Sequence, residues 1–158
     1  MAVSKLTWAQ QRLIAHRGNI NGPSPYENDP TLIDSILNLG IDCEVDVFAV
    51  GGDVWLGHDA TIHKTSMTWL AARSEQLWIH AKNAEAMFVL HRHNEIFSST
   101  LNFFWHETDK VTLTSGGYGW TVLPQFVNPR TVLMCADDSW QTTKLWNFYK
   151  ICTDHIPL

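Results

Sequence analysis

Short apolar runs separated by polar turns recur along most of the chain, with amphipathic stretches between them. Runs of this kind, bounded by Gly, Pro, Asn and Asp, are typical of buried or half-buried strands. They predict strands at residues 13–15, 41–50, 54–56, 77–82, 101–105, 120–123, 131–135 and 150–153. The segment from 108 to 129 has the weakest pattern, and its glycine-rich part at 115–119 predicts a flexible turn.

Helix signals are clearest after the first strand. Asn28 or Asp29 is a suitable N-cap, Pro30 suits the first helical position, and Gly40 is placed to end the helix. Apolar residues at positions 32, 33, 36 and 37 share one face of this helix. Further helices are predicted at residues 66–74, 83–93 and 139–148.

Strands that alternate with helices predict an α/β fold with a parallel sheet and right-handed crossovers. An open doubly wound sheet and a closed barrel are both consistent with this alternation. In either case ligands bind beyond the carboxyl ends of the strands. Polar residues that directly follow a strand are therefore the candidates for chemistry.

Composition narrows the class of protein. The chain has 158 residues, 45 % hydrophobic and 17 % charged, which predicts one globular domain spanning 1–158. No apolar run is long enough to span a bilayer, and the start of the chain lacks the apolar core of an export signal, so a cytoplasmic protein is expected. The net charge of -5 argues against a nucleic-acid partner. The odd number of cysteines predicts buried, reduced thiols.

Two carboxylates mark the predicted strand 41–50. Glu44 and Asp46 are two positions apart, so on a strand their side chains share a face. Buried together, they need a divalent metal or an Arg/Lys pair; alternatively, both face solvent on an edge strand. Cys43, Val45 and Val47 alternate with the two carboxylates and form an apolar face suited to packing against helices. This favours the buried arrangement of Glu44 and Asp46.

Two histidines follow short predicted strands. His16 and His58 stand where a general acid and a general base would be held, and Arg17 can clamp a phosphate. Together with the carboxylate pair these are the groups that displacement at phosphorus needs. His106 follows the predicted strand 101–105 and is interpreted as a solvated loop residue.

These motifs together resemble a known family. The chain resembles the N-terminal signature of the glycerophosphodiester phosphodiesterases, which are phospholipase-C-like TIM-barrel enzymes. The resemblance lies in four segments, in this order: residues 14–18 (Ile-Ala-His-Arg-Gly), Glu27-Asn28 before a helix, residues 44–47 (Glu-Val-Asp-Val) and His58-Asp59. The resemblance is specific over about the first third of the chain. Beyond residue 82 only the segment 151–157 is similar to the family's closing strand.

The resemblance implies a TIM-type β/α barrel. A complete barrel takes about 250 residues, so this one is expected to be reduced or incomplete. Short loops are expected to replace helices between residues 105 and 135. A homo-oligomer that covers the exposed side is also expected.

The resemblance further implies a hydrolase with defined residue roles. A hydroxyl group of the substrate attacks the phosphorus and gives a cyclic phosphodiester that water opens later. It implies that His16 and His58 are the acid/base pair and that Arg17 contacts the phosphate. It also implies that Glu44 and Asp46 bind a divalent cation, usually magnesium or calcium, and that Lys82 stabilises the phosphate anion.

His80 departs from the family pattern, which usually has an acidic metal ligand at this position. Imidazole suits zinc or manganese better than magnesium or calcium. His80 is therefore either a metal ligand that changes the preferred ion or only a hydrogen-bonding replacement.

The sequence thus predicts metal-assisted hydrolysis of a small phosphodiester of lipid metabolism. The alternative is a catalytically silent relative that binds a phosphorylated metabolite or a partner protein. Retention of His16, Arg17, Glu44, Asp46 and His58 favours the enzyme, because a silent protein has no evident need for all five.

Overall fold

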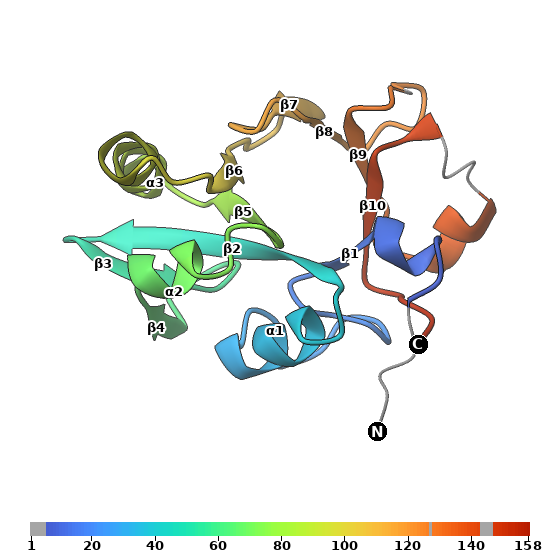
Figure 1. The fold of residues 1–158 in the computed structure, drawn as a ribbon, viewed down its shortest axis with the longest axis horizontal. Helices are drawn as coiled ribbons and strands as arrows, with labels where there is room; N and C mark the ends of the chain where they lie inside the picture. Colours follow the sequence, from blue (N-terminus) through green and yellow to red (C-terminus); the bar gives the residue numbers. More distant parts are fainter. Residues whose placement is uncertain (1–5, 127, 143–146) are drawn as a thin grey trace.

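A curled, mixed β-sheet is the framework of the protein (Figure 1). The computed structural model describes residues 6–126, 128–142 and 147–158, and within them ten strands form this single sheet. The strands are β1 (Leu13–His16), β2 (Asp42–Val50), β3 (Asp53–Leu56), β4 (His63–Thr65), β5 (Leu77–Ala81), β6 (Asn102–Phe104), β7 (Val111–Leu113), β8 (Gly119–Thr121), β9 (Thr131–Met134) and β10 (Lys150–Thr153).

The centre of the sheet is parallel. Neighbouring strands run in the order β6, β5, β2, β1, β10, β9 and β8, and each of these pairs is parallel. Antiparallel pairing occurs where β3 and β4 extend the carboxyl half of β2 and where β7 pairs with β8. The central strands are therefore parallel, but the sheet as a whole is mixed, with β3 and β4 added at β2 and β7 added at β8.

Three α-helices accompany the strands in the described part of the chain: α1 (Pro30–Leu37), α2 (Met67–Ala71) and α3 (Ala84–Phe97). Asp29 is the N-cap of α1, and its side chain accepts hydrogen bonds from the backbone N–H groups of Thr31 and Leu32. Figure 1 shows all three helices outside the curl, beside β2 and β5. None of them is long and apolar enough to cross a membrane.

The TIM-type barrel implied by the resemblance is wrong. A barrel of that type needs a helix after nearly every strand, whereas the described residues between β6 and β10 contain no α-helix. Instead, residues 111–121 form a hairpin whose turn is closed by the hydrogen bond from the Thr114 N–H to the Tyr118 carbonyl. Gly117 adopts φ +77° in this turn, so a turn lies within the predicted segment 115–119, whose last residue, Gly119, already begins β8.

The predicted helix 139–148 is also not found as such. The described residues there contain a short 3-10 helix, Asp138–Thr142, and residues 143–146 of the prediction lie outside the described chain. The sheet is thus a curled half-barrel whose α-helices, in the described part of the chain, lie beside β2 and β5. An oligomer that covers the other side stays a prediction.

Apolar side chains pack on both faces of the sheet. Outside the curl, Cys43, Val45 and Val47 of β2 are buried in a cluster with residues of α1 and α3, as their spacing predicts. Inside the curl, a second buried cluster comes from six different strands: Ile14, Trp78, Phe104, Trp120, Val132 and Cys152. The ring of Phe104 stacks on that of Trp120 at 4.4 Å, which joins β6 to β8. This inner cluster lies on the same face of the sheet as His16, Glu44, Asp46 and His80.

Candidate metal centre and pocket

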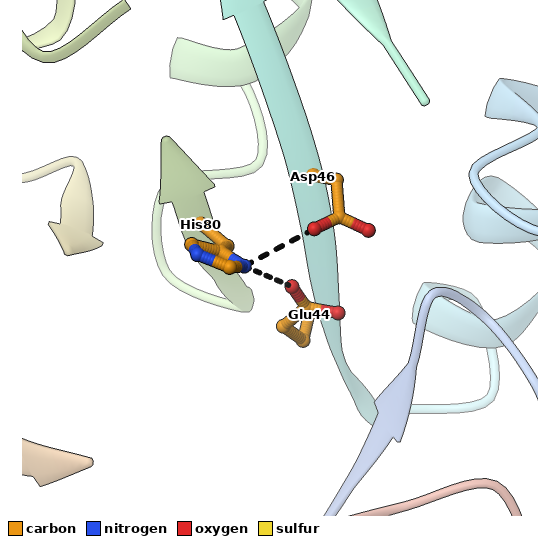
Figure 2. A group of neighbouring side chains, drawn as sticks. All are labelled: Glu44, Asp46 and His80. Carbon is orange, nitrogen blue, oxygen red and sulfur yellow. Dashed lines mark ion pairs between the residues drawn. The ribbon is translucent and has the colours of Figure 1, made fainter. Parts of the chain in front are cut away.

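Strand register brings the predicted site residues of three strands together. Glu44 on β2 lies opposite His16 on β1, and Asp46 lies opposite His80 on β5. Because residues in register on neighbouring parallel strands point to the same side, all four side chains face the inside of the curl. Figure 2 shows Glu44 and Asp46 directed at the ring of His80. The two carboxylates are buried, 2 % and 1 % exposed, so the solvent-facing alternative is excluded.

The loop between β1 and α1 contacts Glu44 and Asp46 through hydrogen bonds and an ion pair. Asn28 is fully buried; its side chain donates to Asp46 Oδ2 at 3.0 Å and accepts from the Asp46 N–H at 2.9 Å. Arg17 and Asn28 both have left-handed backbone conformations, with φ 54° and φ 62°. Such conformations cost free energy in residues other than glycine and persist only where surrounding contacts offset it. For Asn28 the two hydrogen bonds to Asp46 supply those contacts, and for Arg17 the ion pair with Asp46 and the bond from its N–H to Glu44 Oε2 do so.

Glu44, Asp46 and His80 form a group that can hold a metal ion. Their candidate ligand atoms all lie within 4.8 Å of one another. His80 Nδ1 is 3.1 Å from Asp46 Oδ1 and 4.0 Å from Glu44 Oε1. Asp46 Oδ1 is a buried atom that makes no hydrogen bond, although it lies this close to His80. Close to it lie His80 Nδ1 and, at 3.5 Å, Lys82 Nζ, and a cation bound between Asp46, Glu44 and His80 would be stabilised by this buried oxygen.

The position of the His80 ring fits a ligand role. Its other ring nitrogen, Nε2, faces the His106 carbonyl at 3.5 Å. Without a metal ion, the 3.1 Å contact between Nδ1 and Asp46 Oδ1 suits an N–H donated to the carboxylate. With a metal ion bound, Nε2 would carry the proton facing the carbonyl, and Nδ1 would direct its lone pair at the ion. Histidines that bind metals are usually oriented by such a carbonyl. The stacked rings of Phe104 and His106, 5.0 and 4.6 Å from that of His80, hold the same plane.

Negative charge exceeds positive charge around this group. Among the described residues, Arg17 and Lys82 approach it: Arg17 Nε lies 3.1 Å from Asp46 Oδ2, and Lys82 Nζ lies 3.5 Å from Asp46 Oδ1. Four buried or half-buried carboxylates belong to the same network: Glu27, Glu44, Asp46 and Asp154. A divalent cation would balance the excess.

The excess of negative charge has its largest effect on the pKa of Glu44. Burial and the neighbouring Asp46 charge raise the pKa of Glu44 to about 7, although His16, His80 and Arg17 act in the opposite direction. The pKa of Asp46 is lowered: burial alone would raise it, but the proximity of His80, Arg17 and Lys82 outweighs that effect. Without a bound cation, the site therefore holds one ionised carboxylate and one that is partly protonated near neutral pH.

Metal affinity should accordingly depend on pH. A metal ion binds the ionised carboxylate, so Glu44 must lose its proton first. Because its pKa is about 7, we expect the affinity for Mn²⁺ to fall by about tenfold between about pH 8 and about pH 6. Calorimetric titrations at the two pH values measure this change. Equal affinities would mean that Glu44 is not a ligand or is ionised throughout.

His16 is oriented by a carboxylate that the sequence analysis did not assign. Its Nδ1 lies 2.9 Å from Asp154 Oδ1, and Asn19 Nδ2 donates to the same oxygen at 2.7 Å. The pKa of Asp154 is lowered, since burial is outweighed by these two bonds, so Asp154 accepts and His16 Nδ1 donates. Nε2 of His16 is left as the basic atom, 3.9 Å from Glu44 Oε2. The pKa of His16 is raised, because Asp154 and Glu44 outweigh the effect of burial.

A cavity of about 190 Å³ gathers most of the predicted residues. His16, Arg17, Glu44, His58 and His80 all line it. Lys82 is close to Asp46 but does not line the cavity. His58 enters from the segment after β3, and its Nδ1 is 2.7 Å from Asp59 Oδ1. His106, interpreted from the sequence as a solvated loop residue, also lines this cavity.

Arg17 is more constrained than a free phosphate clamp would be. Besides Asp46, its guanidinium contacts Glu27, with Nη1 3.0 Å from Glu27 Oε2. Asn19 donates to the other Glu27 oxygen at 2.8 Å. Arg17 therefore ties the β1–α1 loop to β2, and any phosphate contact has to be made in addition to these two ion pairs.

Comparisons of the chain with models of protein families, with curated proteins and with solved structures give no match.

Proposed function

We propose that the protein is a metal-assisted phosphodiesterase that hydrolyses a small glycerophosphodiester-like substrate and belongs to the glycerophosphodiester phosphodiesterases. The observation that carries the proposal is the cavity that gathers His16, Arg17 and His58 beside Glu44 and His80. These residues come from separate segments of the chain and include an acid/base pair, an anion contact and candidate metal ligands. Displacement at phosphorus needs this combination of groups.

Glu44, Asp46 and His80 would hold the divalent cation, which when bound supplies Lewis-acid stabilisation of charge on the phosphoryl oxygens. The donor set of two carboxylates and one imidazole suits manganese or zinc, and magnesium or calcium if His80 only orients the carboxylates. The burial of Glu44 and Asp46 keeps competing water away from them.

The protein's own residues move the protons. Nε2 of His16, with Nδ1 held by Asp154, takes the proton from the attacking hydroxyl group of the substrate. As the new phosphorus–oxygen bond forms, the bond to the second alcohol breaks, and His58 donates the proton that this alcohol needs to leave. Arg17 neutralises the phosphoryl charge from the side of the β1–α1 loop.

Hydrolysis by metal-stripped protein with single metals added back tests the proposal. Magnesium, calcium, manganese and zinc are supplied separately with two substrates. Glycerophosphocholine carries a hydroxyl group next to the phosphodiester, whereas bis(p-nitrophenyl) phosphate does not. We expect turnover of the first with at least one metal and little turnover of the second. Absence of turnover with every metal would contradict the enzyme.

A binding protein for phosphorylated metabolites is the second candidate. It is favoured by the engagement of Arg17 with Asp46 and Glu27, which is a structural use of that residue. Such a protein would bind glycerol phosphate in the same cavity without turning over a diester. Calorimetry with glycerol phosphate, run beside the hydrolysis assay, distinguishes the two.

We further propose that the protein works in the cytoplasm. The support is that Cys43, Cys135 and Cys152 are all free thiols, which suits a reducing compartment.

A further inference from the structure

The cavity that contains the candidate metal centre has two unlike halves. The half formed by β1, β2 and β5 is polar, with His16, Glu44 and His80. The opposite half is lined by apolar side chains from β6 and from β8, β9 and the segment after β8: Phe104, Trp120, Val122 and Met134. Phe104, Val122 and Met134 offer no conventional hydrogen-bond donor. The polar groups on this side are the indole N–H of Trp120 and the ring of His106, which follows β6 and also lines the cavity.

A second cavity lies beside the apolar half. This neighbouring cavity, about 380 Å³, shares Val122 and Met134 with the first one. Its remaining apolar lining is Pro124, Leu133 and Ala136. The polar groups at its far side are paired with each other: Ser139 Oγ donates to Asp137 Oδ1 at 2.6 Å, and the Ser139 N–H donates to the same oxygen.

We infer that the substrate is a phosphodiester of which one ester group is a hydrocarbon chain. This inference rests on the proposed function, because it places the phosphorus beside Glu44 and His16. The chain would leave the polar half, cross Val122 and Met134, and occupy the second cavity. It deepens the proposed function by assigning the leaving alcohol to an apolar class.

A polyol in the same position would be disfavoured. Its hydroxyl groups would lose hydrogen bonds to water and find few partners on the apolar wall, which costs free energy. A methylene group there gains from leaving water, and the gain corresponds to about fourfold in affinity for each one buried. The wall therefore selects between alcohols of equal size by their polarity.

Three diesters that share a glycerol group test this selection: glycerophosphomethanol, glycerophosphohexanol and glycerophosphoglycerol. Each keeps the hydroxyl group needed for attack, so only the leaving alcohol differs. With the metal that supports turnover, we expect kcat/KM for the hexyl ester to exceed that for the methyl and glyceryl esters by at least about tenfold. Equal values for the three would overturn the inference while leaving the phosphodiesterase intact.

Val122→Asp places a charge on the shared wall, and Val111→Asp is its matched control. Val122 is 48 % exposed and Val111, which lines neither cavity, is 44 % exposed, so both positions tolerate a polar side chain. We expect the hexyl-to-methyl ratio of kcat/KM to fall at least about tenfold in Val122→Asp and to stay unchanged in Val111→Asp. An unchanged ratio in both variants would contradict the apolar path.

Calorimetric binding of hexyl phosphate and methyl phosphate in the presence of Mn²⁺ keeps the inference testable without turnover. Tighter binding of hexyl phosphate, reduced by Val122→Asp, would support the apolar path even if no diester were hydrolysed and the proposed function had failed. Equal affinities for the two phosphates would overturn it.

Discussion

His16→Ala is expected to lower kcat for glycerophosphocholine by about 10²- to 10⁴-fold, the usual contribution of a general base, while the protein stays folded. His16 Nε2 is a basic atom of the cavity, and Asp154 holds the ring through Nδ1. The methyl group of alanine leaves no group that could take the proton. Steady-state hydrolysis and thermal unfolding, measured on the same preparation, check both parts.

The matched control is His91→Ala. His91 lies on α3 with 63 % of its side chain exposed, and its ion pair with Glu95 is a surface contact. Its removal should change neither turnover nor folding. If His16→Ala retained full turnover, the assignment of the base would be wrong. If it failed to fold, the Asp154–His16–Asn19 contacts would be mainly structural, and Asp154→Asn would then be expected to unfold the protein as well.

Glu44→Gln is expected to abolish metal binding and, at the same time, to stabilise the metal-free protein. Gln removes the charge needed for a metal ligand while keeping the size of the side chain, so we expect at least about a hundredfold loss of affinity for Mn²⁺. A carboxylate oxygen of Glu44 accepts from the Arg17 N–H at 3.2 Å, and the amide oxygen of Gln can accept the same bond. Calorimetry measures the first effect and urea unfolding measures the second.

The stability effect depends on pH in a defined direction. The folded state raises the pKa of Glu44 from 4.5 to about 7, so ionised Glu44 opposes folding. The penalty is absent below the unfolded pKa, grows as the pH rises and is complete above about 7. Glu44→Gln should therefore raise the free energy of unfolding by an amount on the order of 3 kcal/mol at about pH 8 and by little at about pH 4. A destabilised variant at about pH 8 would contradict an unbalanced Glu44 charge.

The sequence predicts those features that depend on local pattern. Apolar runs locate the central strands, and the spacing of Glu44 and Asp46 places both on the face opposite to Cys43, Val45 and Val47. The capping signal at Asp29 locates α1. In each case neighbouring residues in the chain determine the outcome, because side-chain direction alternates along a strand and an N-cap bonds within one turn.

Other features depend on residues distant in the chain. Asp154 orients His16 across 138 positions, and its place at the end of an apolar run, within the segment 151–157, gives no indication of that contact. His106 reaches the cavity because its ring stacks on that of His80. Strand β7 is three residues long with Val111 and Leu113 exposed, so it has no buried periodicity to detect. The absence of outer helices there follows from this hairpin.

The contacts of Arg17 and Asn28 with Asp46 affect which residues would stay conserved among related proteins. A descendant that had lost the chemistry would still need these three residues, because the left-handed backbone at Arg17 and Asn28 depends on them. Their persistence in a set of related chains would therefore reveal nothing about turnover. His58 makes its ion-pair contact with the exposed Asp59, so the fold depends on it less. Substitution of His58 among related chains would therefore be an earlier sign of lost hydrolysis than substitution of Arg17, Asn28 or Asp46.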